Sequence, residues 1–238
     1  PFARNRISMP DPTYDLVIFD NDGVLIDSEK LAARGNAELL TGQGYPMTAE
    51  DCERRFAGLS DRDMVAELRA EGVPLPDDFI EQMYAISEHA FLTELEPIAG
   101  VRSVVELAQS RAAIAVASNA PRANVLRNLI TTGYDDLIPA AACFSGLDVP
   151  RPKPAPDLHR AVLAHFDLAP ERALVIEDSP AGASGARAAG VEVIGVLYAV
   201  PDEMKPQRRE AFAALGALAV LDSPAELAET LRQLLPEE

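Results

Sequence analysis

The chain has 238 residues, 48% of them hydrophobic and 25% charged, and this ordinary composition excludes wholesale disorder. Its formal net charge of −17, from 38 acidic and 21 basic residues, disfavours nucleic acid and anionic membrane surfaces as partners. No apolar run approaches the roughly 20 residues that a membrane-spanning helix needs.

The first residues and the cysteines bear on the compartment. Residues 1–13 are polar, contain proline and lack an apolar stretch, so we expect a loose terminus and not a signal peptide. Cys52 and Cys143 are the two cysteines, too few for a disulfide framework and without the spacing of a zinc site. These features predict a cytoplasmic protein in which both thiols are buried.

The first predicted element is a strand at Leu16–Phe19, whose apolar sequence, rich in β-branched residues, suits a strand buried on both faces of a parallel sheet. It ends at Asp20, and Asp22 follows. Ligands bind at the carboxyl ends of strands in open α/β sheets, so these carboxylates form a candidate reaction centre. In so acidic a chain, the triplet Asp20-Asn21-Asp22 could also be a solvated turn.

Helical patterns fill the next stretch, and either Asp27 or Ser28 could cap the first helix. We expect helices at Leu31–Gly42, Glu50–Phe56, Asp61–Ala70 and Phe79–Leu95. No strand pattern interrupts this stretch, and Pro97 and Gly100 mark its end. The chain is therefore predicted to carry an all-helical cap domain at residues 30–97, inserted into a core domain of residues 1–29 and 98–238.

Helices and strands alternate from Val101 onward. Strands are predicted at Ala113–Ala117, Ala141–Phe144, Ala173–Ile176, Val193–Leu197 and Leu218–Leu221. Helices are predicted at Val101–Gln109, Arg122–Thr132, Asp157–Phe166, Gly182–Ala189, Glu210–Leu215 and Pro224–Leu235, with a charged segment at Pro201–Glu210. Such alternation implies right-handed crossovers and an α/β fold with a doubly wound, mostly parallel sheet.

Three predicted strands end in polar side chains, and a loop rich in proline adds a cation. These residues are Asp20, Asp22, Ser118, Asn119, Glu177, Asp178 and Lys153. Parallel strands deliver their carboxyl ends to the same edge of a sheet, so we expect the seven side chains to converge there. Lys153 could instead be a surface lysine, and Glu177 or Asp178 could cap the following helix. His89, His159 and His165 show no partner spacing and are interpreted as structural or solvent-facing.

The excess of carboxylates suggests Mg2+, which prefers a few carboxylates completed by waters and a substrate phosphate. Asp20 and Asp178 are the best ligands, with Glu177 acting through water. A carboxylate that attacks a phosphate dianion meets a repulsion of about 4 kcal/mol per pair of charges at about 4 Å, which Mg2+ and Lys153 would offset. Ser118 and Asn119 would bind the remaining phosphoryl oxygens.

The order of these motifs resembles the haloacid dehalogenase superfamily of phosphohydrolases, in the subgroup with a helical cap inserted after the first motif. The four motifs run from about residue 15 to about residue 198: Asp20-Asn21-Asp22-Gly23-Val24-Leu25, Ser118-Asn119, Lys153 within Arg-Pro-Lys-Pro, and Glu177-Asp178-Ser179 followed by Gly182 and Gly190. The resemblance implies that Asp20 is a nucleophile forming an aspartyl-phosphate. It also implies that Asp22 is the general acid and then the general base, with its backbone carbonyl as a Mg2+ ligand.

The cap is expected to choose the substrate by closing over the reaction centre. Gly58 lies in a segment, Phe56 to Ser60, that resembles the cap loop of β-phosphoglucomutases, but Ala57 and Asp61 stand where the mutase pattern has basic residues. A substrate carboxylate or second phosphate could bind three cap arginines, which could equally be exposed helix residues. These are Arg54, Arg55 and Arg62.

Two further segments, Glu94 to Ile98 and Phe144 to Gly146, look similar to bacterial phosphatases of sugar phosphates such as 6-phosphogluconate. We therefore predict a monomeric, Mg2+-dependent phosphatase of a small phosphorylated metabolite, with sugar phosphates as the leading class. One alternative is a β-phosphoglucomutase-type phosphomutase, which would share all four motifs. The other is a non-catalytic binding protein on the same fold.

Overall fold

The computed structural model describes residues 14–56 and 61–235, so the expected loose terminus at 1–13 lies outside the described residues. Six strands form one sheet in the order β3-β2-β1-β4-β5-β6, and every neighbouring pair is parallel. The strands are β1 Leu16–Phe19, β2 Ala113–Ser118, β3 Cys143–Ser145, β4 Ala173–Glu177, β5 Glu192–Val196 and β6 Ala219–Leu221. The predicted doubly wound parallel sheet is confirmed.

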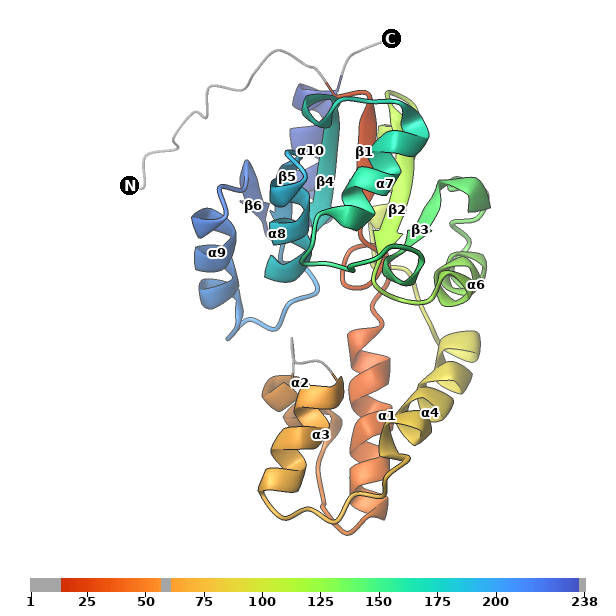
Figure 1. Cartoon of the computed structure of the whole chain (residues 1–238), viewed down its shortest axis with the longest axis vertical. Helices are drawn as coiled ribbons and strands as arrows, with labels where there is room; N and C mark the ends of the chain where they lie inside the picture. The colour runs from red at the N-terminus through yellow and green to blue at the C-terminus, as the bar shows by residue number, and fades with distance from the viewer. Residues whose placement is uncertain (1–13, 57–60, 236–238) are drawn as a thin grey trace.

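Helices cover both faces of this sheet. They are α1 Glu29–Gly42, α2 Ala49–Phe56, α3 Asp61–Ala70, α4 Phe79–Thr93, α5 Val101–Gln109, α6 Arg122–Thr132, α7 Asp157–Phe166, α8 Pro180–Ala188, α9 Lys205–Ala214 and α10 Pro224–Leu234. In Figure 1, α7 and α8 lie in front of the sheet, while α10 lies behind it and packs against α5. Among the residues described, no helix combines the length and apolar character needed to cross a membrane.

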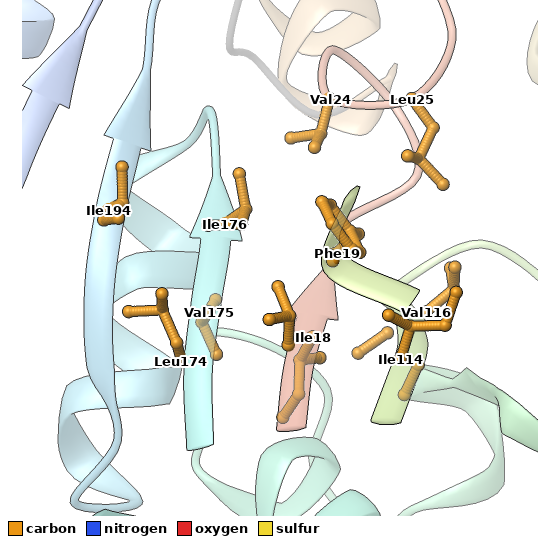
Figure 2. Packing of buried hydrophobic residues seen from close by; sticks show 14 of the residues in the cluster. Ile18, Phe19, Val24, Leu25, Ile114, Val116, Leu174, Val175, Ile176 and Ile194 are labelled. Carbon is orange, nitrogen blue, oxygen red and sulfur yellow. The ribbon is translucent and has the colours of Figure 1, made fainter. Parts of the chain in front are cut away.

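Strand β1 lies inside the sheet because its four residues, Leu-Val-Ile-Phe, are apolar on both faces. It pairs with residues 113–116 of β2 on one side and with residues 173–176 of β4 on the other. Figure 2 shows Val24 and Leu25, from the segment after β1, closing the core above Phe19. Asp20, which follows Phe19, is therefore delivered to the middle of the sheet's carboxyl edge.

The helices α1–α4 lie together below the sheet in Figure 1 and have a hydrophobic cluster of their own. Leu40, Leu68 and Phe79 are fully buried in it. The two connections to the sheet run side by side, since Ile98 N donates to Leu25 O at 3.0 Å and residue 26 forms a bridge with residue 97. The inserted helical unit agrees with the predicted fold class, while the domain boundaries at 29/30 and 97/98 stay a prediction.

Both cysteines are free and buried, Cys52 among these helices and Cys143 in the main core.

Several predicted element starts are wrong, and α1, for example, begins at Glu29 and not at Leu31. Helix α9 begins at Lys205 and not at Glu210, because Pro206 is tolerated in the first turn of a helix and the charged residues after it remain helical. Residues 140–142 form a short 3-10 turn, so β3 starts at Cys143 and not at Ala141. Helix α8 begins at Pro180, where the fixed φ of proline suits a first helical residue.

The predicted helix caps are also corrected. Ser28 occupies the N-cap position of α1, but its side chain makes no capping hydrogen bond there. The Asp27 carboxylate instead accepts from Lys30 Nζ at 2.7 Å. At α8 the cap is Ser179, whose Oγ accepts from Gly182 N at 3.1 Å, so Asp178 does not cap that helix. The carboxylate of Asp178 is therefore not used as a helix cap and lies at the carboxyl edge of the sheet.

Candidate active site

One cleft at the carboxyl edge of the sheet contains all seven residues that the strand ends predicted. It has a volume of about 230 Å3. The seven are Asp20, Asp22, Ser118, Asn119, Lys153, Glu177 and Asp178. They come together because β1, β2 and β4 are adjacent parallel strands, and because the loop after β3 reaches across the same edge.

Lys153 holds two carboxylates at the base of the cleft. Its Nζ lies 2.9 Å from Asp20 Oδ1 and 2.7 Å from Glu177 Oε2, and its side chain is 5% exposed. The surface-lysine alternative is therefore wrong. Asp20 Oδ2 has no hydrogen bond in the described part of the chain. Asp20 lines the cleft, and one of its oxygens is fixed by a cation.

The loop that carries Lys153 is held by Asn119. The Asn119 amide donates to Lys153 O at 3.1 Å, and Lys153 N donates to Asn119 Oδ1 at 3.0 Å. Gly146 lies against this amide, because a Cβ there would come within 2.5 Å of Asn119 Oδ1. Asn119 therefore positions the lysine loop, and its predicted contact with the phosphoryl group stays a prediction.

Three side chains hold the Asp22 carboxylate. Ser28 Oγ donates to Oδ1 at 2.6 Å, whereas Asn21 Nδ2 at 3.2 Å and Ser118 Oγ at 3.4 Å reach Oδ2 over longer distances. Ser118 Oγ also accepts from Ala120 N at 3.1 Å. The carboxylate therefore has a defined orientation from which it could exchange a proton with a group in the cleft.

Ligand oxygens of Asp20, Glu177 and Asp178 lie within 4.8 Å of one another. Oxygen donors of this kind suit a hard divalent cation such as Mg2+. Both oxygens of Glu177 already accept hydrogen bonds, one from Lys153 and the other from Ser179 Oγ at 2.8 Å. The residues present fit a cation held directly by Asp20 and Asp178, with Glu177 behind them.

The electrostatics of the cluster also fit a cation. Burial raises the pKa of Asp20 to about 8, with the Glu177 charge adding to the rise and Lys153 opposing it. Burial likewise raises the pKa of Asp178, and the charges of Glu177 and Asp20 add to it. For Lys153, burial disfavours the ammonium, but the two carboxylates outweigh burial and raise its pKa. A divalent cation among these oxygens would favour their charged forms.

Two glycines let backbone approach the acids closely. A Cβ on Gly23 would come within 2.4 Å of Asp178 Oδ2, and one on Gly182 would come within 1.9 Å of Glu177 Oε2. Gly23 also has a φ of +72°, which favours glycine. Both glycines are therefore required by the packing of the acidic cluster.

The predicted cap residues do not line this cleft in the described part of the chain. Arg54 is exposed and pairs with Asp51 on its own helix. Arg55 is engaged by Glu67, Glu71 and the Tyr45 hydroxyl within the cap. Arg62 is exposed on α3, and Gly58 lies outside the described residues. Their predicted substrate contacts stay a prediction.

Sequence reasoning did not assign four residues that the structure brings to the cleft or its supports. Ser28 holds Asp22, as described above, and Glu29 and Arg208 line the cleft. Tyr198 donates its hydroxyl to Val24 O at 2.9 Å and so ties the segment after β5 to the segment after β1. The strand order could have indicated Tyr198 and Arg208, since the connection that follows β5 also starts at the carboxyl edge of the sheet.

Neither His159 nor His165 lines the cleft. His159 is fully buried on α7, and neither ring nitrogen has a hydrogen-bond partner among the described residues. Burial, with a contribution from the Lys153 charge, lowers the pKa of His159 to about 3. His165 is exposed and makes edge contacts with Phe144 and Phe166. Nothing is described of the His89 side chain.

Known proteins resemble this chain in sequence. The sequence pattern of a family described as haloacid dehalogenase-like hydrolase matches residues 17–196. A phosphorylated carbohydrates phosphatase of Thermotoga maritima is 30% identical over 229 residues, which cover 93% of this chain and 100% of that relative. A 6-phosphogluconate phosphatase of Escherichia coli is 30% identical over 181 residues, which cover 75% of this chain and 80% of that relative.

A solved structure extends the similarity to three dimensions. A HAD family hydrolase of Deinococcus radiodurans, with bound phosphate and sodium, has a TM-score of 0.79 and 30% sequence identity. The comparison covers 95% of this chain and 100% of that one. The match therefore spans both the sheet and the inserted helices.

Proposed function

This chain belongs to the haloacid dehalogenase-like hydrolase family, and we propose that it hydrolyses a small phosphorylated carbohydrate with Mg2+, through a phosphorylated Asp20. It is an enzyme of the phosphomonoester hydrolase class, as its named relatives are. The observation that carries the mechanism is the state of Asp20. One of its oxygens accepts from Lys153, the other has no hydrogen bond in the described chain, and Asp20 lines a cleft together with the remaining motif residues.

In the first step, the open oxygen of Asp20 attacks the phosphorus of the substrate. A bond forms between that oxygen and phosphorus while the bond to the sugar oxygen breaks. Asp22 gives its proton to the departing sugar oxygen, which prevents the release of a costly alkoxide. The products of this step are the free carbohydrate and an aspartyl-phosphate on Asp20.

In the second step, Asp22, now ionised, takes a proton from a water molecule that attacks the same phosphorus. The bond between phosphorus and Asp20 breaks, which regenerates the carboxylate and releases inorganic phosphate. Ser28 keeps Asp22 oriented in both steps through its 2.6 Å hydrogen bond. A single carboxylate thus serves as acid and then as base, for which an enhancement of about 100- to 10,000-fold is typical.

Charge is the main obstacle to both steps, because a carboxylate approaches a phosphate dianion. Lys153 reduces this repulsion, because its ammonium pairs with the carboxylates of Asp20 and Glu177. A bound Mg2+, held by Asp20, Asp178 and the main-chain carbonyl of Asp22, would supply further positive charge at the phosphoryl oxygens. Ser118 and Asn119 would orient the phosphoryl group by hydrogen bonds.

The experiment that tests this proposal measures inorganic phosphate release from a panel of sugar phosphates, phosphoglycolate and nucleotides, with Mg2+ and with EDTA. Release should require the metal and should disappear in Asp20→Asn. Asp15→Asn is the matched control, since Asp15 lies at the other end of β1 and pairs with Arg172 on the surface. No phosphate from any compound, from folded protein, would overturn the proposal.

The same assay separates the two alternatives. A phosphomutase returns the phosphoryl group to the sugar, so β-glucose 1-phosphate would be isomerised with little free phosphate. A binding protein would retain ligands without turnover. The proposal also includes a cytoplasmic location, with which two free buried cysteines are compatible, and a monomeric state that size-exclusion chromatography would test.

A further inference from the structure

Arg208 is a cation in the active-site cleft to which the mechanism above assigns no part. It lies in the first half of α9, is half-buried, and lines the same cleft as Asp20 and Lys153. Its Nη1 donates to the main-chain oxygen of Asp178 at 3.0 Å. The Tyr198 hydroxyl anchors the preceding segment at the same edge of the sheet. Arg208 is therefore held at the cleft by contacts on both sides of the connection between β5 and α9.

The charges around the cleft leave Arg208 with capacity to bind. Among the described residues, five carboxylates and two cations line the cleft, the cations being Lys153 and Arg208. The ammonium of Lys153 is committed to Asp20 and Glu177. Arg208, by contrast, forms no ion pair with a described residue, and its one hydrogen bond uses one of five N–H donors. Most of its N–H donors therefore remain available for a ligand.

The charge of Arg208 acts on two carboxylates that line the cleft, Glu29 and Asp178. Burial raises the pKa of Glu29, the first residue of α1, while the Arg208 charge opposes that rise and the charge of Glu53, on α2, adds to it. Glu29 lines the cleft at the start of α1, so the cleft wall there is acidic. An anionic group of a substrate would be repelled there unless Arg208 received it.

We propose that Arg208 is a specificity-determining residue that binds a second anionic group, a carboxylate or a phosphate, of the phosphorylated carbohydrate. This rests on the proposed function. The planar fork of a guanidinium matches both groups with two parallel hydrogen bonds. Lys153 and Arg208 then serve opposite ends of the substrate, the phosphoryl group to be removed and the anion that is retained.

Matched substrates test this assignment. In the first pair, sorbitol 6-phosphate has an alcohol at the carbon farthest from the phosphate, whereas 6-phosphogluconate has a carboxylate there. In the second pair, fructose 1,6-bisphosphate carries a second phosphate that fructose 6-phosphate lacks. In Arg208→Gln, kcat/KM for a substrate with the second anion should fall by roughly 10- to 100-fold, because a charged hydrogen bond is lost. For its partner without that anion, the change should stay below about threefold. Arg208→Lys should recover part of the loss.

A binding measurement runs beside the kinetics. In an Asp20→Asn background, calorimetry compares the affinities of the same four compounds with and without Arg208→Gln. Arg208→Gln should weaken the binding only of the two compounds that carry a second anion. Arg209→Gln is the control, because it removes the same charge from the neighbouring residue, which pairs with Asp222. It should leave the preference between the paired compounds unchanged.

Equal losses for both members of each pair would overturn the assignment, since they would mean that Arg208 acts only by holding the Asp178 peptide. The same preference change in Arg209→Gln would also overturn it, by showing an effect of net charge. If the wild-type chain releases phosphate from no compound, the proposed function fails. The binding comparison would still decide the role of Arg208.

Discussion

The Ser28 hydroxyl donates a 2.6 Å hydrogen bond to the Asp22 carboxylate, so the residue at the N-cap position of α1 contacts the proposed acid and base. The other two contacts of this carboxylate, from Asn21 and Ser118, are 3.2 Å and 3.4 Å long. The connection between the sheet and the inserted helices therefore takes part in orienting a reactive group.

Replacing Ser28 by Ala should lower kcat by about tenfold, because the shortest hydrogen bond that orients Asp22 is lost. Steady-state kinetics on the best sugar phosphate would measure this effect. Ser110→Ala serves as the control, since the Ser110 hydroxyl bonds only Leu107 O at the surface among the described residues. An unchanged kcat in Ser28→Ala would contradict the proposed orientation.

Replacing Gly23 by Ala should abolish most of the stabilisation by Mg2+. The added Cβ would lie within 2.4 Å of Asp178 Oδ2 and would displace this proposed ligand. In the wild type, Mg2+ at about 100 times its dissociation constant should stabilise the fold by about 2.7 kcal/mol, visible as a rise in Tm. Gly44→Ala is the matched control, because Gly44 has a φ of +82° and, apart from its chain neighbours, no described residue has an atom within 4 Å of its Cβ position. It should suffer similar backbone strain but keep the Mg2+ response, and an equal loss in both variants would refute the role of Gly23.

Replacing Lys153 by Met should destabilise the fold by about 3–5 kcal/mol in EDTA, because it leaves Asp20 and Glu177 as unpaired like charges. Urea unfolding would report the change. The control Lys30→Met removes an ammonium that is 66% exposed and pairs with Asp27 on the surface, so its cost should stay under about 1 kcal/mol. Similar costs in the two variants would show that Lys153 has no special electrostatic role.

His159 should make the fold less stable as the pH falls. Burial lowers the pKa of His159 to about 3, whereas in the unfolded chain the pKa would lie near the ordinary histidine value of 6.5. Between these values the unfolded state holds more protons, so stability rises with pH, and about 2 kcal/mol of it is lost between about pH 6.5 and about pH 5.

Urea unfolding at several pH values would show this loss disappear in His159→Met. The control His165→Gln, at an exposed position on the same helix, should keep it. A slope that is identical in the wild type and His159→Met would mean that the buried imidazole is not the source.

Local sequence patterns predicted most of the regular structure. The apolar run of β1 and the helical periodicities of α5, α6 and α7 give the observed bounds without change. The patterns failed at α9, where Pro206 and a run of charged residues hide a helix that begins at Lys205. Such a helix shows little apolar periodicity, because one narrow face contacts the core and Phe212 is its one fully buried side chain.

The sequence by itself determined which groups stand at the strand ends and, through the parallel-sheet rule, that they share one edge. It could not assign Ser28 to Asp22 or bring Arg208 into the cleft, since neither contact follows from periodicity. Lys153 and Asp20 are 133 positions apart, yet one ammonium joins Asp20 to Glu177. Only the tertiary structure decided these partnerships, because backbone periodicity depends on near neighbours, whereas hydrogen bonds across the cleft depend on strand order and loop packing.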